Sequence, residues 1–139
     1  MDVHSKETRS YNMSRIMGKN TKPEIVVRQF LFSKGFRYRL HRQTLPGKPD
    51  IVLPKYKTVI FVHGCFWHGH EDCRYFVIPK TRTEWWVNKI KRNQEVDREN
   101  IKKLKNLGWK VLIIFECELK KEKIDTTVRK LLNRLYATK

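Results

Sequence analysis

The sequence predicts an α/β domain in which a mixed central sheet is flanked by helices. Three observations lead to this fold class. Predicted helices and strands alternate along the chain, short apolar segments bounded by turn residues indicate buried strands, and longer amphipathic segments indicate helices that cover the sheet. With 139 residues, of which 40% are hydrophobic, the chain can bury one core and is too short for two ordinary domains.

Two of the predicted helices begin with the same capping pattern. Thr21 and Glu24 stand three residues apart, as do Thr81 and Glu84, and this is the spacing of a capping box. Glycines at the far ends of both segments are typical helix stops. A third segment near the C-terminus has leucines at helical spacing. The predicted helices span residues 21–35, 81–107 and 126–137.

Strands are predicted at 36–41, 51–53, 58–62 and 109–115. The segment 36–41 alternates apolar with basic residues, which is typical of a half-exposed strand. The segment 109–115 is the most apolar, and we expect it at the centre of the sheet. The resulting order is α-β-β-β-α-β-α.

The chain is strongly basic, with 31 Lys and Arg against 14 Asp and Glu and a formal net charge of +17. Such a charge predicts binding to nucleic acid, because neutralising phosphates releases counterions; a merely solubilising charge is the alternative. We expect residues 1–20, which include Met13 on a short apolar face, to form an arm or helix that contacts DNA, and residues 21–139 to form the single main domain. The beginning of the chain lacks the apolar core of a signal peptide, so a cytosolic protein is expected.

Cysteine and histidine residues suggest a metal site. Cys65, His70, Cys73 and Cys117 would supply three sulfurs and one nitrogen, a common set for structural zinc. Cys65 closely follows the strand 58–62, and Cys117 closely follows the strand 109–115. If these strands are parallel neighbours, both cysteines emerge at the same edge of the sheet. Three unrelated cysteines, or His68 in place of His70, are the alternatives.

Acidic and histidine residues suggest a catalytic site. Asp50 in "KPD" precedes one strand, as does the carboxylate that holds Mg²⁺ in many nucleases, although a turn residue is the simpler interpretation. His63 and His68 flank Cys65 and could transfer protons or contact phosphate. Glu24 is either part of this site or only a capping residue. Asp97 either orients a histidine or is a solvated helix charge.

Four aromatic residues near the cysteines could contact bases. Phe66 and Trp67 lie between two candidate metal ligands, and Trp85 and Trp86 lie near the start of the second long helix. Aromatic rings held away from the core can stack on bases or unstack a base step. Packing in the core is the alternative, above all for the tryptophan pair, since adjacent helical residues cannot point the same way.

Together these segments resemble the very-short-patch repair endonucleases. The resemblance covers nearly the whole chain in order and rests on "TRSYNM", "LPGKPDIV", "VIFVHGCFWHGHEDC", "TRTEWW" and "LGWKVLIIFEC". It implies a restriction-endonuclease-like fold, a structural zinc and a Mg²⁺-dependent nick 5′ to the T of a T·G mismatch left by deamination of 5-methylcytosine.

The resemblance also implies roles for individual residues. The catalytic residues would be Asp50, His63, His68, Glu24 and Asp97, with Asp97 orienting His68. Mg²⁺ would be held by Asp50 and the main-chain carbonyl of Val62. The zinc ligands would be Cys65, His70, Cys73 and Cys117. The DNA-contacting residues would be Phe66, Trp67 and Trp86, which intercalate, together with Met13.

Two departures from the family pattern and two rival functions remain. Val62 stands where the family usually has threonine. The segment 65–73, which contains three of the candidate zinc ligands and is called the zinc loop, has one extra residue before Cys73. The rivals are a zinc-stabilised DNA-binding module without catalysis and a nuclease of the same fold without mismatch preference. We expect a monomer acting on double-stranded DNA, with a functional link to a cytosine-5 DNA methyltransferase that is implied by the family alone.

Overall fold

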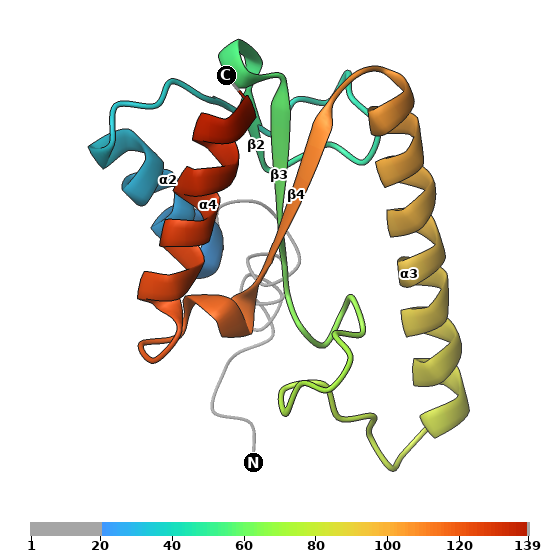
Figure 1. The fold of residues 1–139 in the computed structure, drawn as a ribbon. Helices are drawn as coiled ribbons and strands as arrows, with labels where there is room; N and C mark the ends of the chain where they lie inside the picture. The colour runs from blue at the N-terminus through green and yellow to red at the C-terminus, as the bar shows by residue number, and fades with distance from the viewer. Residues whose placement is uncertain (1–20, 139) are drawn as a thin grey trace, which may run out of the picture.

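The computed structural model describes residues 21–138, which form a four-stranded sheet with helices on both faces (Figure 1). The α-helices are α2 (Lys22–Ser33), α3 (Thr83–Asn106) and α4 (Ile124–Thr138). The strands are β1 (Arg39–Leu40), β2 (Ile51–Leu53), β3 (Thr58–His63) and β4 (Lys110–Phe115). Two short 3₁₀ helices are η1 (Pro54–Tyr56) and η2 (Glu116–Leu119). Met13 lies outside the described residues.

The strand order is β1-β2-β3-β4, with antiparallel pairing up to β3 and parallel pairing between β3 and β4. The predicted mixed sheet flanked by helices is therefore confirmed, and β3 and β4 are parallel neighbours. His63 pairs with Phe115, so the C-terminal ends of β3 and β4 lie at the same end of the sheet. The antiparallel pairing of β2 with β3 brings the start of β2 to this end as well.

The sheet separates two hydrophobic clusters, because alternate side chains of a strand point to opposite faces. On the face covered by α2 and α4, side chains such as Ile60 and Leu112 pack against Leu31 and Leu135 (Figure 1). On the face covered by α3, strand residues pack around Leu104. Burial on both faces explains why the strands are nearly continuous apolar segments.

Three local predictions are wrong. Strand β4 lies at an edge of the described sheet rather than at its centre. The half-exposed strand is reduced to Arg39–Leu40. Neither predicted capping box forms: Thr21 caps α2 without a side-chain hydrogen bond, and α3 starts after Arg82 rather than Thr81. Within residues 21–138, the helices are too short or too polar to cross a membrane.

Candidate active site

One cleft, at the end of the sheet where β2 begins and β3 ends, contains the residues predicted to carry out catalysis. It forms where the start of β2, the end of β3, the N-terminus of α2 and the middle of α3 meet. The loop between β3 and α3 closes one side of it. The lining includes Glu24, Asp50, Val62, His63, Phe66, Trp67, His68, Asn93 and Asp97.

The acidic part of the cleft is built from two carboxyl groups. The Val62 N–H donates to Asp50 Oδ2 at 2.7 Å, and this bond fixes the carboxylate beside the end of β3. Glu24 is buried and lies 4.0 Å from Arg28. Burial raises the pKa of Asp50 to about 7 against the opposing Val62 hydrogen bond, and the nearby Glu24 carboxyl adds to the increase.

These carboxyl groups fit a hard divalent cation. Two neighbouring carboxylates repel each other when both are charged, and a cation that lies between them relieves this repulsion. The cleft is open to solvent, which leaves room for water molecules and a phosphate in the coordination shell. Glu24 thus lines the cleft beside Asp50, and the capping box predicted for it with Thr21 does not form.

The histidine part of the cleft contains two stacked imidazoles. The rings of His63 and His68 lie 3.7 Å apart and 5° from parallel. Asp97 Oδ2 accepts a hydrogen bond from His68 Nδ1 at 2.6 Å, which leaves Nε2 available to a substrate. Burial, and then the neighbouring His68, lower the pKa of His63 to about 4, while Asp97 opposes the decrease. His63 is therefore neutral near pH 7.

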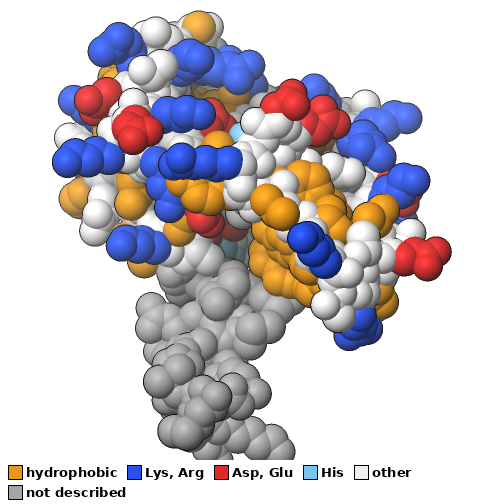
Figure 2. Space-filling model, turned by 90° about the horizontal axis from the view of Figure 1, so that it is seen from below, with side chains coloured by type: hydrophobic (Ala, Val, Ile, Leu, Met, Phe, Trp, Pro, Cys, Tyr) orange, Lys and Arg blue, Asp and Glu red, His pale blue; other side chains and the backbone are white. Residues whose placement is uncertain are grey.

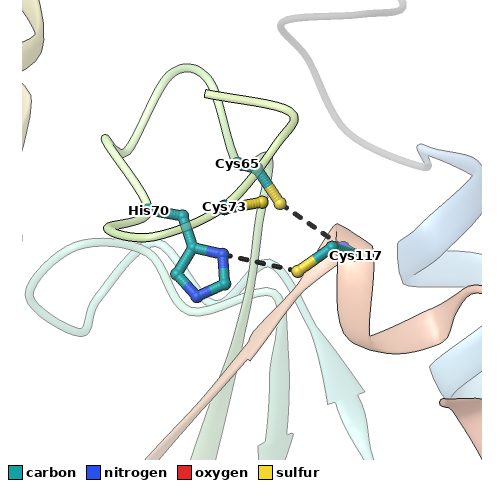
Figure 3. Close-up of side chains that lie close together, drawn as sticks. All are labelled: Cys65, His70, Cys73 and Cys117. Carbon is teal, nitrogen blue, oxygen red and sulfur yellow. Dashed lines mark hydrogen bonds between the residues drawn. The ribbon is translucent and has the colours of Figure 1, made fainter. Parts of the chain in front are cut away.

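The four predicted zinc ligands come together beside this cleft (Figure 3). Their ligand atoms all lie within 4.8 Å of one another. His70 Nδ1 lies 3.4 Å from the sulfur of Cys117, and the Cys117 N–H donates to the sulfur of Cys65 at 3.4 Å. Cys65, His70 and Cys73 come from the loop between β3 and α3, whereas Cys117 comes from η2, so the cluster joins the loop to the sheet.

The donor set suits zinc. Thiolates and one imidazole are the usual ligands of a closed tetrahedral zinc site. Burial raises the pKa of Cys65 to about 12 against the opposing hydrogen bond from the Cys117 N–H, and the side chains of Cys117 and Cys73 add to the increase. A cation beside this thiol favours its ionised form. His70, not His68, joins the cysteines, because His68 is bonded to Asp97.

Helix α3 holds the zinc loop through two residues that no sequence motif indicated. The side-chain amide of Asn93 donates to the Trp67 carbonyl at 2.9 Å, and that of Gln94 donates to the Gly69 carbonyl at 3.0 Å. Asp97 lies one turn after Asn93 on the same helix. The signal available in the sequence is that Asn93 and Gln94 precede Asp97 by four and three residues, the spacing of neighbours on one face of a helix. The helix that orients the histidine thus also fixes the loop.

The aromatic residues form a cluster at the rim of the cleft. Phe66 lies 5.4 Å from Trp67 and 5.2 Å from Trp86, measured between ring centroids. All three are half-buried, whereas Trp85 is 47% exposed and carries the Arg82 guanidinium on its face. Figure 2 shows a hydrophobic patch at the end of the molecule that carries the zinc loop and the start of α3, with many Lys and Arg side chains over the rest of this face.

His41 is a further residue of the cleft region that the sequence motifs did not reveal. Its Nε2 lies 2.7 Å from Glu24 Oε1. In the sequence it appears only as the last residue of a predicted half-exposed strand, nine positions before Asp50. The proximity arises from the pairing of β1 with β2, and no local pattern indicates it.

Comparison with known proteins identifies the family. Residues 1–74 match the DNA mismatch endonuclease Vsr family. The chain is 50% identical over 134 residues to the type II nicking enzyme V.NmeAIP of Neisseria meningitidis, covering 96% of this chain and 93% of the relative. The chain belongs to the Vsr family. It is 48% identical over 119 residues to the DNA mismatch endonuclease Vsr of Escherichia coli, covering 86% of this chain and 76% of that protein.

Membership of the Vsr family confirms the predicted resemblance and makes the protein a DNA endonuclease. The alternative of a DNA-binding module without catalysis is therefore set aside. Relatives with similar identity carry two kinds of name, DNA mismatch endonuclease and type II nicking enzyme. A second relative of the latter kind, V.XorIIP of Xanthomonas oryzae, is 49% identical over 118 residues, covering 85% of this chain and 86% of the relative.

Proposed function

We propose that this Vsr-family protein is a Mg²⁺-dependent endonuclease that nicks one DNA strand 5′ to the T of a T·G mismatch and so initiates very-short-patch repair. One observation carries the proposal: a single cleft places a carboxylate pair, an oriented histidine and an aromatic cluster side by side. Cleavage groups and a base-stacking surface would then act on adjacent parts of one DNA site. A companion cytosine-5 methyltransferase would generate the methylated bases whose deamination gives the mismatch.

The proposed cleavage roles follow from the contacts in the cleft. Asp50 and the Val62 carbonyl would hold Mg²⁺, which activates a water molecule and stabilises charge on a phosphate. Asp97 holds the ring of His68 through Nδ1, and the remaining nitrogen, Nε2, would exchange a proton with the reacting groups. The neutral imidazole of His63, stacked on His68, would donate a hydrogen bond to the phosphate rather than bring a positive charge.

The proposed zinc site acts by positioning. With Cys65, His70 and Cys73 bound together, the residues between them cannot move independently of Cys117 and the sheet. Phe66, Trp67 and His68 all lie within that closed segment. Insertion of the aromatic rings into DNA would therefore be coupled to placement of His68.

A direct test uses an end-labelled duplex with one T·G mismatch and a fully paired duplex of the same sequence. Each is incubated with zinc-loaded protein, with Mg²⁺ added or omitted. A single Mg²⁺-dependent nick 5′ to the mismatched T, absent from the paired duplex, is expected. Equal nicking of both duplexes would favour the second candidate, a nicking enzyme without mismatch preference, which the names of V.NmeAIP and V.XorIIP make the principal rival.

Loss of the aromatic cluster should remove mismatch preference. In the double variant Phe66→Ala and Trp67→Ala, we expect the ratio of nicking rates on mismatched and paired duplexes to fall about 10- to 100-fold, since stacking on a base contributes about 1–3 kcal/mol. Phe32→Ala is a matched control because Phe32 is 68% exposed on α2 and does not line the cleft. A double variant that keeps the full ratio would show that these rings do not sense the mismatch.

Protons should compete with Mg²⁺ at Asp50. Because the pKa of Asp50 is raised to about 7, the ionised form that binds a cation is lost as the pH falls through 7. The Mg²⁺ concentration that gives half-maximal nicking should therefore rise up to about tenfold per pH unit below about pH 7 and level off above about pH 8. The pKa of His63 is about 4 and lies outside this range. Mg²⁺ titrations of the nicking rate at several pH values test this, and a half-maximal concentration independent of pH would contradict it.

A further inference from the structure

The carboxylate pair in the cleft has a third potential ligand beside it. Glu24, His41 and Asp50 each offer one ligand atom, and these atoms all lie within 4.8 Å of one another. His41 Nε2 is 2.7 Å from Glu24 Oε1, and the side chains of His41 and Glu24 are only 13% and 3% exposed. An imidazole that is nearly buried against two carboxyl groups is therefore part of the same cluster.

The backbone holds His41 in this place from the other side. The His41 N–H donates to the Asp50 carbonyl at 3.2 Å, which continues the antiparallel pairing of β1 with β2. His41 also has a φ of 46°, a left-handed conformation that is uncommon for a residue with a Cβ. Such conformations persist where the surrounding structure fixes them, and they are concentrated at functional sites. The turn therefore directs the imidazole at Glu24 instead of letting the strand continue.

The mixture of donors points to a particular ion preference. Carboxylates alone suit Mg²⁺, which takes oxygen ligands almost exclusively, whereas a nitrogen donor from imidazole favours transition metals. We propose that His41 joins Glu24 and Asp50 as a ligand of the divalent cation in the cleft, so that the site binds Mn²⁺ more tightly than Mg²⁺. This inference rests on the proposed function, since it concerns the cation that Asp50 is proposed to hold.

The competing explanation is that His41 only positions Glu24 through their hydrogen bond. Positioning alone would support Mg²⁺ and Mn²⁺ equally, because the oxygen donors are the same for both ions. A ligand role makes two distinct predictions: loss of His41 weakens Mn²⁺ selectively, and bound Mn²⁺ has a nitrogen nucleus in its coordination shell.

The test measures ion binding directly, on zinc-loaded protein bound to its nicked duplex. Mn²⁺ and Mg²⁺ affinities are measured by calorimetry, and the nitrogen coupling of bound Mn²⁺ is measured by pulsed electron paramagnetic resonance. In His41→Ala, Mn²⁺ affinity should fall at least about tenfold with little change for Mg²⁺, and the nitrogen coupling should disappear. His41→Gln, which can still donate a hydrogen bond to Glu24, should show the same losses.

Several results would overturn the proposal. These are an equal loss of affinity for both ions, normal Mn²⁺ binding by His41→Gln, absence of bound Mn²⁺ in the unaltered protein, or a nitrogen signal that survives in His41→Ala and vanishes in His63→Ala. Asp50→Ala separates this failure from failure of the proposed function. If Asp50→Ala still nicks DNA, the proposed site is wrong; if it loses ion binding and nicking while His41→Ala behaves normally, only the role of His41 is wrong.

Discussion

Replacement of Asp50 by alanine is expected to lower the rate of nicking at least about a thousandfold, which corresponds to roughly 4 kcal/mol of transition-state stabilisation. The carboxylate is fixed by a hydrogen bond from the Val62 N–H at 2.7 Å, at the end of the sheet where β2 begins and β3 ends. Glu24 cannot move into the position that Asp50 leaves, because its Oε1 is held 2.7 Å from His41 Nε2. Affinity for DNA should persist, since the net charge of +17 supplies phosphate contacts that the variant retains.

The experiment compares single-turnover nicking with DNA binding measured without Mg²⁺. Asp125→Ala is a matched control, because it removes the same charge from an exposed position in the first turn of α4. Asp50→Asn preserves the size of the side chain and should be as inactive as Asp50→Ala, which distinguishes loss of the charged ligand from a cavity. An Asp50→Ala variant that nicks within a few fold of the unaltered protein would refute the assigned role.

The elements that were predicted correctly are those determined by periodicity along the chain. The buried strands and the long helices occupy the predicted segments, because a buried strand requires consecutive apolar residues and a covering helix requires an apolar stripe. One long-range feature was also predictable. Cys65 and Cys117 each follow a buried strand closely, so parallel pairing of β3 and β4 was sufficient to bring them together.

The position of β4 could not be predicted in the same way. Its apolar sequence reports that both of its faces are covered, by α3 on one side and by α4 on the other. Coverage of the faces is independent of the number of neighbouring strands. Hydrophobicity therefore indicated burial correctly and indicated a central position wrongly.

The candidate active site contains the largest departures from local rules. Glu24 has capping-box spacing from Thr21, yet its carboxyl group bonds to His41 and lies beside Asp50. The position of the His41 side chain depends on a left-handed backbone conformation, and no glycine in the sequence indicates it. Tertiary contacts replace the local preference in both cases, as expected where side chains serve chemistry rather than helix stability.

Loss of one zinc ligand is expected to have the largest effect on stability. The segment between β3 and α3 contains no helix or strand, so few backbone hydrogen bonds hold it in place. Binding of a structural zinc contributes about 10 kcal/mol to folding, which is comparable with the whole stability of an ordinary domain. The cluster also reaches from this loop to Cys117 in η2. Its removal should therefore release the loop from the sheet.

We expect Cys117→Ser and His70→Ala to lose bound zinc, to unfold at a temperature lower by about 10 °C or more, an order-of-magnitude figure for a loss of several kcal/mol, and to lose nicking because Phe66, Trp67 and His68 are no longer held. His70→Cys is the matched control, because four cysteines also bind zinc tetrahedrally. It should retain the metal, most of the thermal stability and the nick. Zinc content, thermal unfolding and nicking are measured on the same preparations. Stoichiometric zinc in Cys117→Ser, or an unchanged unfolding temperature in a variant that has lost its zinc, would show that this cluster does not hold the loop in place.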